Sequence, residues 1–250
     1  MSNTNLRVMS FNIKVGGINE ERKLGATATI RKYSPDLLGI QEANGRWMDH
    51  LLATVSDVYD HVYLGRDDPE RGEGTPVFYK KDVFELISSG TKWLSDTPEV
   101  FSVVEGSRYT RIMTYAELSV RASGERVIFV STHLDYIKDE VALKQAKIMH
   151  KICRELFGDD VTIFITGDFN MTPDTETIKY MTTDFALTSA GANEVISDNT
   201  PTNYEQKIII DYCFYNAKCA TPTAYKVIED KYEGVYPSDH WPLYADFILK

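Results

Sequence analysis

The chain alternates short apolar runs with longer segments whose apolar residues recur at helical spacing. Four apolar runs predict buried strands over residues 6–13, 37–42, 125–133 and 161–166. Three segments predict helices over residues 20–33, 46–55 and 139–157, the first of which stops before Pro35. Further strands are predicted over residues 62–64, 76–79, 84–90, 109–120, 207–215 and 244–249.

The order of these elements predicts an α/β fold. Each half of the chain gives a strand, a helix, a second strand and then further strands, and no Pro- or Ser-rich linker separates the halves. Two mixed β-sheets packed face to face and flanked by helices would bury all the apolar strands. A chain of 250 residues, 43% of them hydrophobic, is long enough to build such a core. We therefore predict one domain over residues 1–250.

Polar residues stand where the apolar strands stop, and the burial of apolar surface does not explain them. They are Asn12, Glu42, His133, Asp168, Asn170 and Asp211, with Asp239 and His240 shortly before the last strand. In α/β proteins the carboxyl ends of strands are where binding and catalytic groups gather. Singly, most of them have ordinary explanations, such as a turn for Asn12. Asp211 is the hardest to explain in this way, because it interrupts an apolar strand and a buried charge needs a partner.

Together these residues predict a site that combines a metal ion with a base. Carboxylate and amide oxygens suit Mg²⁺ or Mn²⁺, and the chain lacks the Cys/His cluster of a structural zinc site. A histidine that is backed by a buried aspartate has a fixed tautomer and a raised basicity.

The charge of the chain makes extensive nucleic-acid binding less favourable. Lys and Arg total 27 against 37 Asp and Glu, so the net charge is −10, and no run of positive charges is present. Non-specific nucleic-acid binding relies on a basic face, and we expect no strongly basic face here. A phosphoester substrate remains compatible with the acidic balance, because a bound divalent cation can supply the missing positive charge.

Other features bear on where the protein works. No apolar run reaches the roughly 18–20 residues of a membrane span, and residues 1–7 are too polar for a signal peptide. The three cysteines, Cys153, Cys213 and Cys219, cannot all pair within one chain, and reduced thiols suit the cytoplasm. One disulfide or a metal-bound cysteine is the alternative. We expect a cytoplasmic monomer, with secretion of a trimmed precursor as the alternative.

Six short segments resemble, in order, the motifs of the endonuclease/exonuclease/phosphatase superfamily, which has the DNase I-like fold. They occupy residues 10–14, 41–42, 131–135, 167–170, 210–212 and 238–243. Any one of them is a short string with many chance matches, but six in order at suitable spacing are specific. The resemblance spans residues 6–248, and it implies a four-layer α/β sandwich that hydrolyses phosphoesters with the help of a divalent metal.

The resemblance also implies how the metal and the nucleophile are handled. Glu42 would be the principal ligand of a Mg²⁺ or Mn²⁺ ion, with Asn12 beside it. Asp239 would tune the metal site. Asp168 would position or deprotonate the attacking water, and Asn170 would hold a phosphate oxygen.

Further groups would act on the phosphate and the leaving group. His240, oriented by Asp211, would stabilise the charge of the transition state or assist the leaving group. His133 would contact the phosphate from the other side. Arg111 stands where an uncharacterised bacterial group of the superfamily places an arginine facing the phosphate. Lys14 replaces the acidic residue that many abasic-site endonucleases carry there, which argues against abasic-site repair.

Three functions compete. The leading one is a phosphodiesterase or phosphatase acting on a small-molecule or lipid head-group phosphate, which the net charge favours. The alternative is an endo- or exonuclease acting on DNA or RNA. A non-catalytic binding module is disfavoured, because the chain keeps Glu42, Asp168 and His240. Specificity would lie in the loops at residues 67–75, 94–107 and 193–205.

Overall fold

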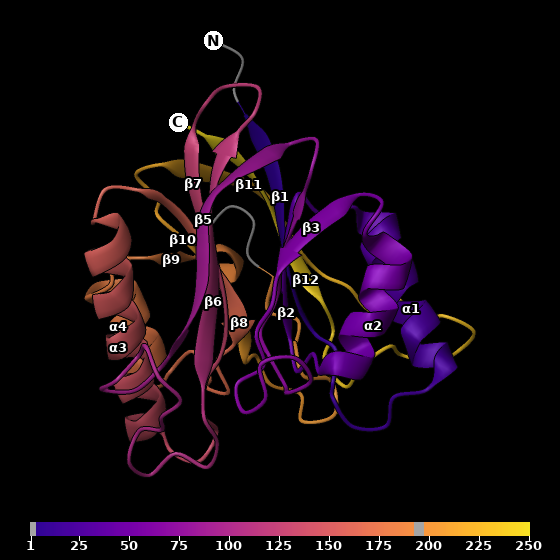
Figure 1. Cartoon of the computed structure of the whole chain (residues 1–250), viewed down its shortest axis with the longest axis horizontal. Coiled ribbons are helices and arrows are strands. Elements are labelled where there is room, and N and C mark those ends of the chain that lie inside the picture. Colours follow the sequence, from indigo (N-terminus) through magenta and orange to yellow (C-terminus); the bar gives the residue numbers. More distant parts are fainter. Residues whose placement is uncertain (1–3, 193–197) are drawn as a thin grey trace.

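The computed structural model of the protein describes residues 4–192 and 198–250. Within these residues two six-stranded sheets pack face to face (Figure 1). The first sheet has the order β11 (Ala220–Val227), β12 (Leu243–Leu249), β1 (Asn5–Asn12), β2 (Leu37–Gln41), β4 (Val77–Lys80) and β3 (Tyr59–Val62). The second has the order β5 (Phe84–Trp93), β6 (Ile112–Val120), β7 (Arg126–His133), β8 (Thr162–Asp168), β10 (Asp211–Tyr215) and β9 (Thr188–Ser189). Both sheets are mixed, because β1 and β2 run parallel, as do β7 and β8, among antiparallel neighbours.

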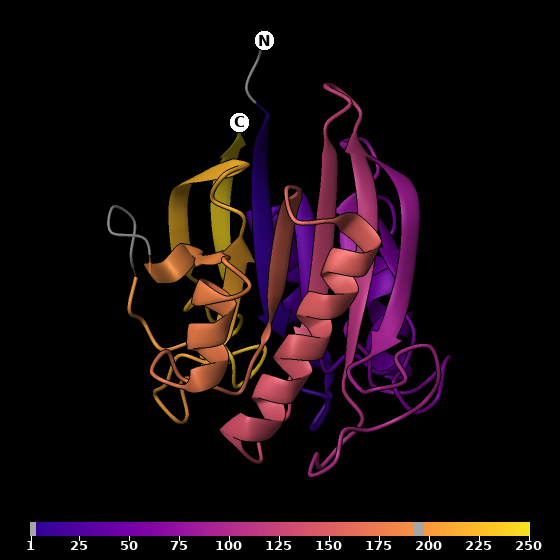
Figure 2. The ribbon, with the colours of Figure 1, turned by 90° about the vertical axis from the view of Figure 1, so that its left-hand side faces the viewer.

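Helices cover the outer face of each sheet. The first sheet carries α1 (Glu20–Tyr33) and α2 (Gly45–Val55). The second carries α3 (Asp139–Phe157) and α4 (Glu176–Thr183), which lie across its face in Figure 2. A short 3₁₀ turn, η1 (Ala190–Ala192), follows β9. The four layers confirm the predicted fold class.

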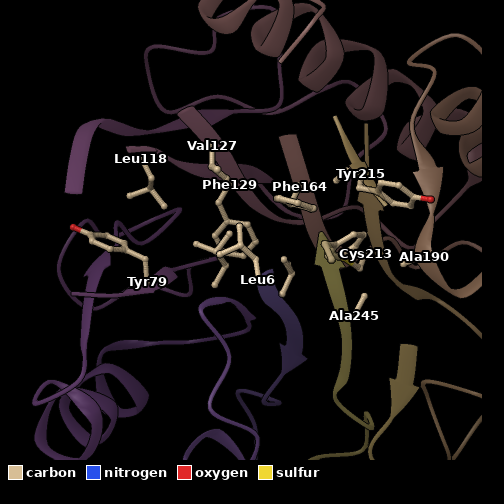
Figure 3. Close-up of a cluster of buried hydrophobic side chains, with 14 of the residues drawn as sticks. Leu6, Tyr79, Leu118, Val127, Phe129, Phe164, Ala190, Cys213, Tyr215 and Ala245 are labelled. Atoms are coloured by element: carbon tan, nitrogen blue, oxygen red, sulfur yellow. The ribbon is translucent and has the colours of Figure 1, made fainter. Parts of the chain in front are cut away.

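Three apolar clusters hold the layers together. Phe129, Phe164 and Phe247 belong to the cluster between the two sheets (Figure 3). A second cluster joins the second sheet to α3 and α4, and a third joins the first sheet to α1 and α2. Because successive strand residues point to opposite faces, each central strand is apolar on both sides. This explains the continuous apolar runs of the sequence.

The face of each sheet that looks toward the other sheet changes from apolar to polar along the strands. In β7, Val127 and Phe129 lie in the core between the sheets, and Ser131 and His133 follow on the same face. The same period of two leads β8 from Phe164 to Asp168. Apolar packing therefore fixes one end of each strand, and the polar residues gather at the other end.

A glycine lets the sheets approach each other at this transition. A Cβ atom on Gly39 would lie 2.1 Å from Oγ1 of Thr166. Gln41, fully buried at the end of β2, donates a hydrogen bond of 3.1 Å to Oγ of Ser131 in the other sheet. Ser131 in turn donates to the carbonyl oxygen of Ile40. This layer of cross-sheet hydrogen bonds supports the site that lies beyond it.

The structure also corrects part of the sequence-based prediction. The strand expected over residues 207–215 begins only at Asp211, because residues 207–210 belong to a loop. Ile208 exchanges backbone hydrogen bonds with Asn203, and the amides of Ile210 and Asp211 donate to Oγ1 of Thr202. The elements that the sequence did not indicate are α4, β9 and β11.

The cysteine prediction agrees with the structure, since Cys153, Cys213 and Cys219 are all free. Among the described residues, none of the helices has the length and apolar character that crossing a membrane requires.

Candidate active site

Most of the predicted residues meet around one cavity of about 470 Å³ at the polar end of the strands. Asp168, the last residue of β8, is paired with His133 of β7 on one side and with Asp211 of β10 on the other. The residues of the predicted set that line the cavity are Glu42, Arg111, His133, Asp168, Asn170, Asp239 and His240. Asn12 hydrogen-bonds to Glu42 and Asp168, and Asp211 hydrogen-bonds to His240.

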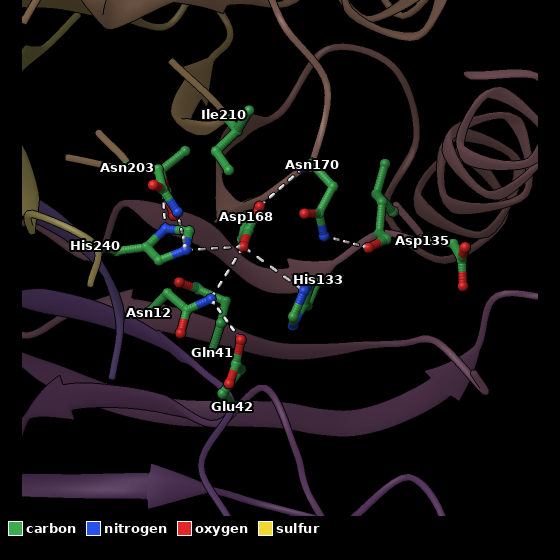
Figure 4. A network of polar contacts seen from close by, with 12 residues as sticks. Asn12, Gln41, Glu42, His133, Asp135, Asp168, Asn170, Asn203, Ile210 and His240 are labelled. Atoms are coloured by element: carbon green, nitrogen blue, oxygen red, sulfur yellow. Dashed lines mark hydrogen bonds and ion pairs between the residues drawn. The ribbon is translucent and has the colours of Figure 1, made fainter. Parts of the chain in front are cut away.

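Asp168 lies at the centre of this group (Figure 4). Its Oδ2 accepts a hydrogen bond of 3.0 Å from Nδ2 of Asn12. The same oxygen lies 3.6 Å from Nε2 of His133 and 3.7 Å from Nε2 of His240. Burial, reinforced by the negative charge of Asp211, raises the pKa of Asp168 to about 7. In the absence of a cation, this carboxylate is therefore a base whose pKa lies near neutrality.

Glu42 reaches the site from the other sheet. It follows β2 in the left-handed conformation, with a φ of 62°, which turns its side chain away from the strand direction. Its Oε2 accepts a hydrogen bond from the amide of Val15, and its Oε1 accepts one of 3.1 Å from Nδ2 of Asn12. The Asn12 amide group thus lies between the carboxylates of Glu42 and Asp168.

His240 and Asp211 form a buried pair. Nδ1 of His240 lies 2.8 Å from Oδ2 of Asp211. Burial lowers the pKa of His240, but the carboxylates of Asp211 and Asp168 outweigh that effect and raise it to about 10. His240 is therefore an imidazolium at neutral pH. Nδ2 of Asn203 lies 3.1 Å from Nε2 of this ring. Both atoms are donors when the ring is charged, so this contact is not a hydrogen bond in that state.

His133 has the opposite protonation state. Its side chain is buried, and burial, together with the positive charge of Arg111, holds the pKa of His133 well below its usual value. The ring is neutral at physiological pH. Its Nδ1 is buried without a hydrogen-bond partner among the described residues. Two histidines of different charge thus flank Asp168.

Arg111 is buried in the wall of the cavity. Only 4% of its surface is exposed, and its Nε lies 3.7 Å from Oδ2 of Asp135, too far for a hydrogen bond. Nε and Nη1 have no hydrogen-bond partner within the described part of the chain. A buried guanidinium with free donors is suited to bind an anionic group that enters the cavity.

Asn170 is only partly available to a ligand. It follows β8 in the left-handed conformation, with a φ of 54°, and its backbone amide donates to Oδ1 of Asp168. Its Nδ2 donates one hydrogen bond of 2.9 Å to the carbonyl oxygen of Leu134. The second N–H of this NH₂ group is left for a ligand.

The residues present fit a divalent cation. Oxygen or nitrogen atoms of Glu42, His133 and Asp168 lie within 4.8 Å of one another. The carboxylate oxygens are of the type that Mg²⁺ and Mn²⁺ prefer. The amide oxygen of Asn12 is of that type too, but it accepts a hydrogen bond from the amide of Lys14. The buried Asp168 carboxylate lies beside other negative charges, and a cation would compensate this accumulation.

Asp239 faces the cavity but already has a cationic partner. Its Oδ2 lies 2.7 Å from Nζ of Lys14, and this ion pair links the loop after β1 to the residue before His240. The role that the resemblance implies for Asp239 in tuning the metal site remains a prediction.

Several lining residues were not identified from the sequence. Glu73 and Asn203 belong to the loops predicted to carry specificity, over residues 67–75 and 193–205, of which residues 193–197 lie outside the described residues. The polar lining residues outside those loops that the sequence did not single out are Arg66, Tyr109, Tyr136 and Gln206. They lie in loops without periodic patterning, and they meet only through long-range contacts. Nothing in the sequence indicated that Asn203 would contact His240.

Comparisons with known proteins identify the family and support the fold. The model of the Endonuclease/Exonuclease/phosphatase family matches residues 9–240. The crystal structure of an endonuclease/exonuclease/phosphatase from Bacteroides vulgatus is 27% identical, with a TM-score of 0.88, over 99% of this chain and 100% of that one. A mannosyl-6-phosphatase from Bacteroides thetaiotaomicron is 23% identical, with a TM-score of 0.83, over 97% and 99% of the two chains.

A D. rerio TDP2 structure with a single-strand DNA product shares the fold at 18% identity, with a TM-score of 0.77, over 98% of this chain and 99% of that one. No match is found among curated protein sequences.

Proposed function

The chain belongs to the endonuclease/exonuclease/phosphatase family, and on this premise we propose that it is a divalent-metal-dependent phosphoester hydrolase acting on a small-molecule or lipid head-group phosphate. One observation carries the proposal. The buried Asp168 carboxylate lies between the neutral ring of His133 and the charged ring of His240, at 3.6 and 3.7 Å. Asp168 as a base, His240 as an acid and His133 as a polar contact group thus lie side by side in the cavity.

Glu42 and Asn12, with Asp168 next to them, would hold a Mg²⁺ or Mn²⁺ ion, and the bound cation would neutralise the phosphate oxygens and stabilise the charge of the transition state. Asp168 would accept the proton of the attacking water at a carboxylate oxygen. Without a cation, burial and the charge of Asp211 raise the pKa of Asp168 to about 7. The bound cation would lower this pKa and keep the carboxylate ionised, in the form that can accept a proton.

His240 would donate a hydrogen bond from Nε2 to the charged phosphate or to the leaving oxygen. The hydrogen bond from Nδ1 to Asp211 fixes the ring orientation and keeps the ring protonated. Arg111 and Asn170 would hold the remaining phosphate oxygens through donors that no described residue occupies. The neutral His133 would contact the phosphate from the side of β7.

A small substrate is supported by the net charge of −10. A relative of known name, the mannosyl-6-phosphatase from Bacteroides thetaiotaomicron, has the same fold. The three free cysteines support our placing of the protein in the reducing cytoplasm.

The test is a panel of substrates, each assayed with Mg²⁺, with Mn²⁺ and with EDTA. The panel contains bis(p-nitrophenyl) phosphate, p-nitrophenyl phosphate, sphingomyelin, plasmid DNA and RNA. We expect metal-dependent hydrolysis of one or both aryl esters or of sphingomyelin, and weak or no cleavage of the nucleic acids. Hydrolysis at the same rate in EDTA, or of no compound with either metal, would contradict the proposal.

A nuclease is the second candidate, because the TDP2 structure of this fold holds a single-strand DNA product. The salt dependence of duplex binding separates the two functions. Each neutralised phosphate contributes about 0.9 to the slope of log K against log salt concentration. We expect a slope shallower than about −4, and a steeper slope would favour the nuclease.

A further inference from the structure

Two exposed tyrosines line the cavity that holds Asp168. Tyr109 precedes β6, and Tyr136 follows β7. Tyr109 is 42% exposed and Tyr136 is 49% exposed. Their ring centroids lie 6.3 Å apart, with the ring planes inclined at 42°. Large aromatic side chains contribute most to stability when they are buried, so exposed rings beside a candidate active site call for another explanation.

One buried carboxylate orders both tyrosine-bearing segments. Asp135 is fully buried, and its Oδ2 accepts hydrogen bonds from Oγ of Ser107 at 2.8 Å and from the amide of Tyr109 at 3.3 Å. Its Oδ1 accepts a hydrogen bond of 2.9 Å from the amide of Ile137, next to Tyr136. The backbones that carry the two rings are therefore fixed before any ligand binds, which reduces the entropy lost on binding.

The surroundings of Tyr109 are positively charged. The guanidinium carbon of Arg66 lies 4.9 Å from the centroid of the Tyr109 ring, and that of Arg111 lies 5.6 Å from it. Arg66 is compensated by an ion pair of 2.9 Å with Glu73. Arg111 keeps two buried donors without a hydrogen-bond partner in the described residues. The cavity thus offers donors for an anionic group directly beside an aromatic wall.

We propose that Tyr109 and Tyr136 form a ring-binding subsite, which holds a cyclic group of the phosphoester while its phosphate lies toward Arg111 and Asp168. The inference rests on the proposed function and adds the substrate class: esters whose organic group contains a ring with a flat apolar face. Sugar rings and aromatic rings share this feature, and both pack on tyrosine. A flexible acyl chain lacks it.

Phosphonates test the subsite without the need for turnover, because their carbon–phosphorus bond replaces the ester bond. The dissociation constants of methylphosphonate, phenylphosphonate, cyclohexylphosphonate and octylphosphonate are measured by calorimetry in the presence of Mg²⁺. In the wild type we expect the better of the two cyclic compounds to bind about tenfold more tightly than methylphosphonate, since stacking on one aromatic side chain typically contributes a factor of this order. Preference for the phenyl or the cyclohexyl compound distinguishes an aromatic ring from a saturated one.

Variants of the two tyrosines show which side chains cause the preference for cyclic phosphonates. Tyr109→Ala and Tyr136→Ala should each reduce the ratio of cyclic to methyl affinity several-fold, while the affinity for methylphosphonate stays within a factor of about two. Tyr109→Phe and Tyr136→Phe should keep the ratio. Phe101→Ser is the matched control, because Phe101 is 61% exposed in a neighbouring loop and does not line the cavity.

Each remaining outcome is decisive. An unchanged ratio in both alanine variants, or no preference for a ring in the wild type, would overturn the ring-binding subsite alone. Tightest binding of octylphosphonate would also overturn it and assign the wall to an alkyl chain. Failure of all four phosphonates to bind, together with no hydrolysis in the substrate panel, would overturn the proposed function itself.

Discussion

Arg22 of α1 donates a hydrogen bond of 3.0 Å from Nε to the carbonyl oxygen of Pro237, three residues before His240. The same buried guanidinium donates to the carbonyl oxygens of Ile13, Lys14 and Gly16. It therefore connects the loop after β1, whose Val15 amide holds Glu42, with the loop that carries His240. No carboxylate pairs with it among the described residues, so its charge is compensated by backbone dipoles.

The first prediction concerns Arg22. Arg22→Met keeps much of the side-chain length but removes the donor from the carbonyl oxygens of Ile13, Gly16 and Pro237. The carbonyl oxygen of Lys14 keeps a hydrogen bond from Nε1 of Trp47. We expect a loss of stability of about 1–3 kcal/mol, the typical result of unsatisfied buried polar groups. We also expect turnover to fall about tenfold or more at a temperature where the variant is folded, because a small displacement of catalytic groups has large effects.

The control for this prediction is Arg31→Met in the same helix. Arg31 pairs with Asp57 at the surface, so its loss should change neither turnover nor the melting temperature appreciably. Thermal unfolding and initial rates are measured for both variants. If Arg22→Met lost stability but kept wild-type turnover, Arg22 would have no positioning role.

The second prediction concerns Glu42. Glu42→Gln keeps the shape of the side chain but removes the negative charge, so the cation should bind more weakly and turnover at low Mg²⁺ should fall strongly. The measurements are the metal dependence of the rate and the rise in melting temperature on adding Mn²⁺, which should shrink in the variant. Glu117→Gln is the control, because Glu117 lies in β6 away from the cavity and forms an ion pair with Arg126 of β7. Full activity of the wild type in EDTA would argue against any metal role.

The third prediction is that Asp211 and His240 act as one unit. If Asp211 works by orienting and charging the imidazole, Asp211→Asn and His240→Ala should not have additive effects on the free energy of activation. The double variant should resemble the worse single variant. A complete double-mutant cycle of kcat/KM measures this coupling. Multiplicative losses would show that Asp211 contributes to structure independently of His240.

The central strands and their polar ends could be predicted from the sequence, and the physical reason is visible in β8. Its apolar residues are buried on both faces, which produces a run that is distinct in the sequence. Where the apolar run stops, Asp168 faces the polar cavity instead of an apolar cluster, and its side chain is available for chemistry. Short motifs at such strand ends are therefore informative, and their order identified the family.

Other elements left no comparable pattern. The strand β11 is an edge strand with mostly half-buried or exposed residues and a register shift near Pro222, so neither an apolar run nor clean alternation marks it. The helix α4 has only eight residues. The strand predicted over residues 207–215 was wrong for residues 207–210, which lie in a loop: Ile208 bonds to Asn203, and Ile209 packs against the second apolar cluster. Asp135 brings the segments of Tyr109 and Tyr136 together, and this arrangement depends on the completed fold.

The fourth prediction concerns the dependence of stability on pH, at a site remote from the cavity. Burial lowers the pKa of His150, whose ring stacks on Phe185 with centroids 4.1 Å apart. The unfolded chain, with a histidine pKa of about 6.5, therefore binds more protons than the folded one below that pH. The contribution of His150 to stability should therefore fall as the pH is lowered from about 7.5 to about 5.5, whereas Asp168 and His240, whose pKa values are raised, contribute in the opposite direction.

His150→Phe preserves the stacked ring and removes the titrating group. Urea unfolding at the two pH values should show a smaller pH-induced loss of stability in this variant than in the wild type. The loss from other buried histidines, such as His61, should remain. An identical loss in both proteins would mean that His150 titrates alike in the folded and unfolded chains.

The last prediction concerns Asp168, whose side chain we expect to serve chemistry rather than stability. Asp168→Asn keeps the acceptor for the Asn170 amide but removes the charge that burial and Asp211 destabilise. Without metal, the loss of this charge offsets the weakened contact with Asn12, so the melting temperature should stay close to that of the wild type or rise. Turnover at saturating Mg²⁺ should fall about 10²–10⁴-fold, the usual contribution of a general base.

The rate and the melting temperature together separate a role of Asp168 in chemistry from a role in the fold. A variant that keeps more than about a tenth of the rate has lost no general base. One that loses activity together with several degrees of melting temperature would show that the Asp168 carboxylate is needed for the fold.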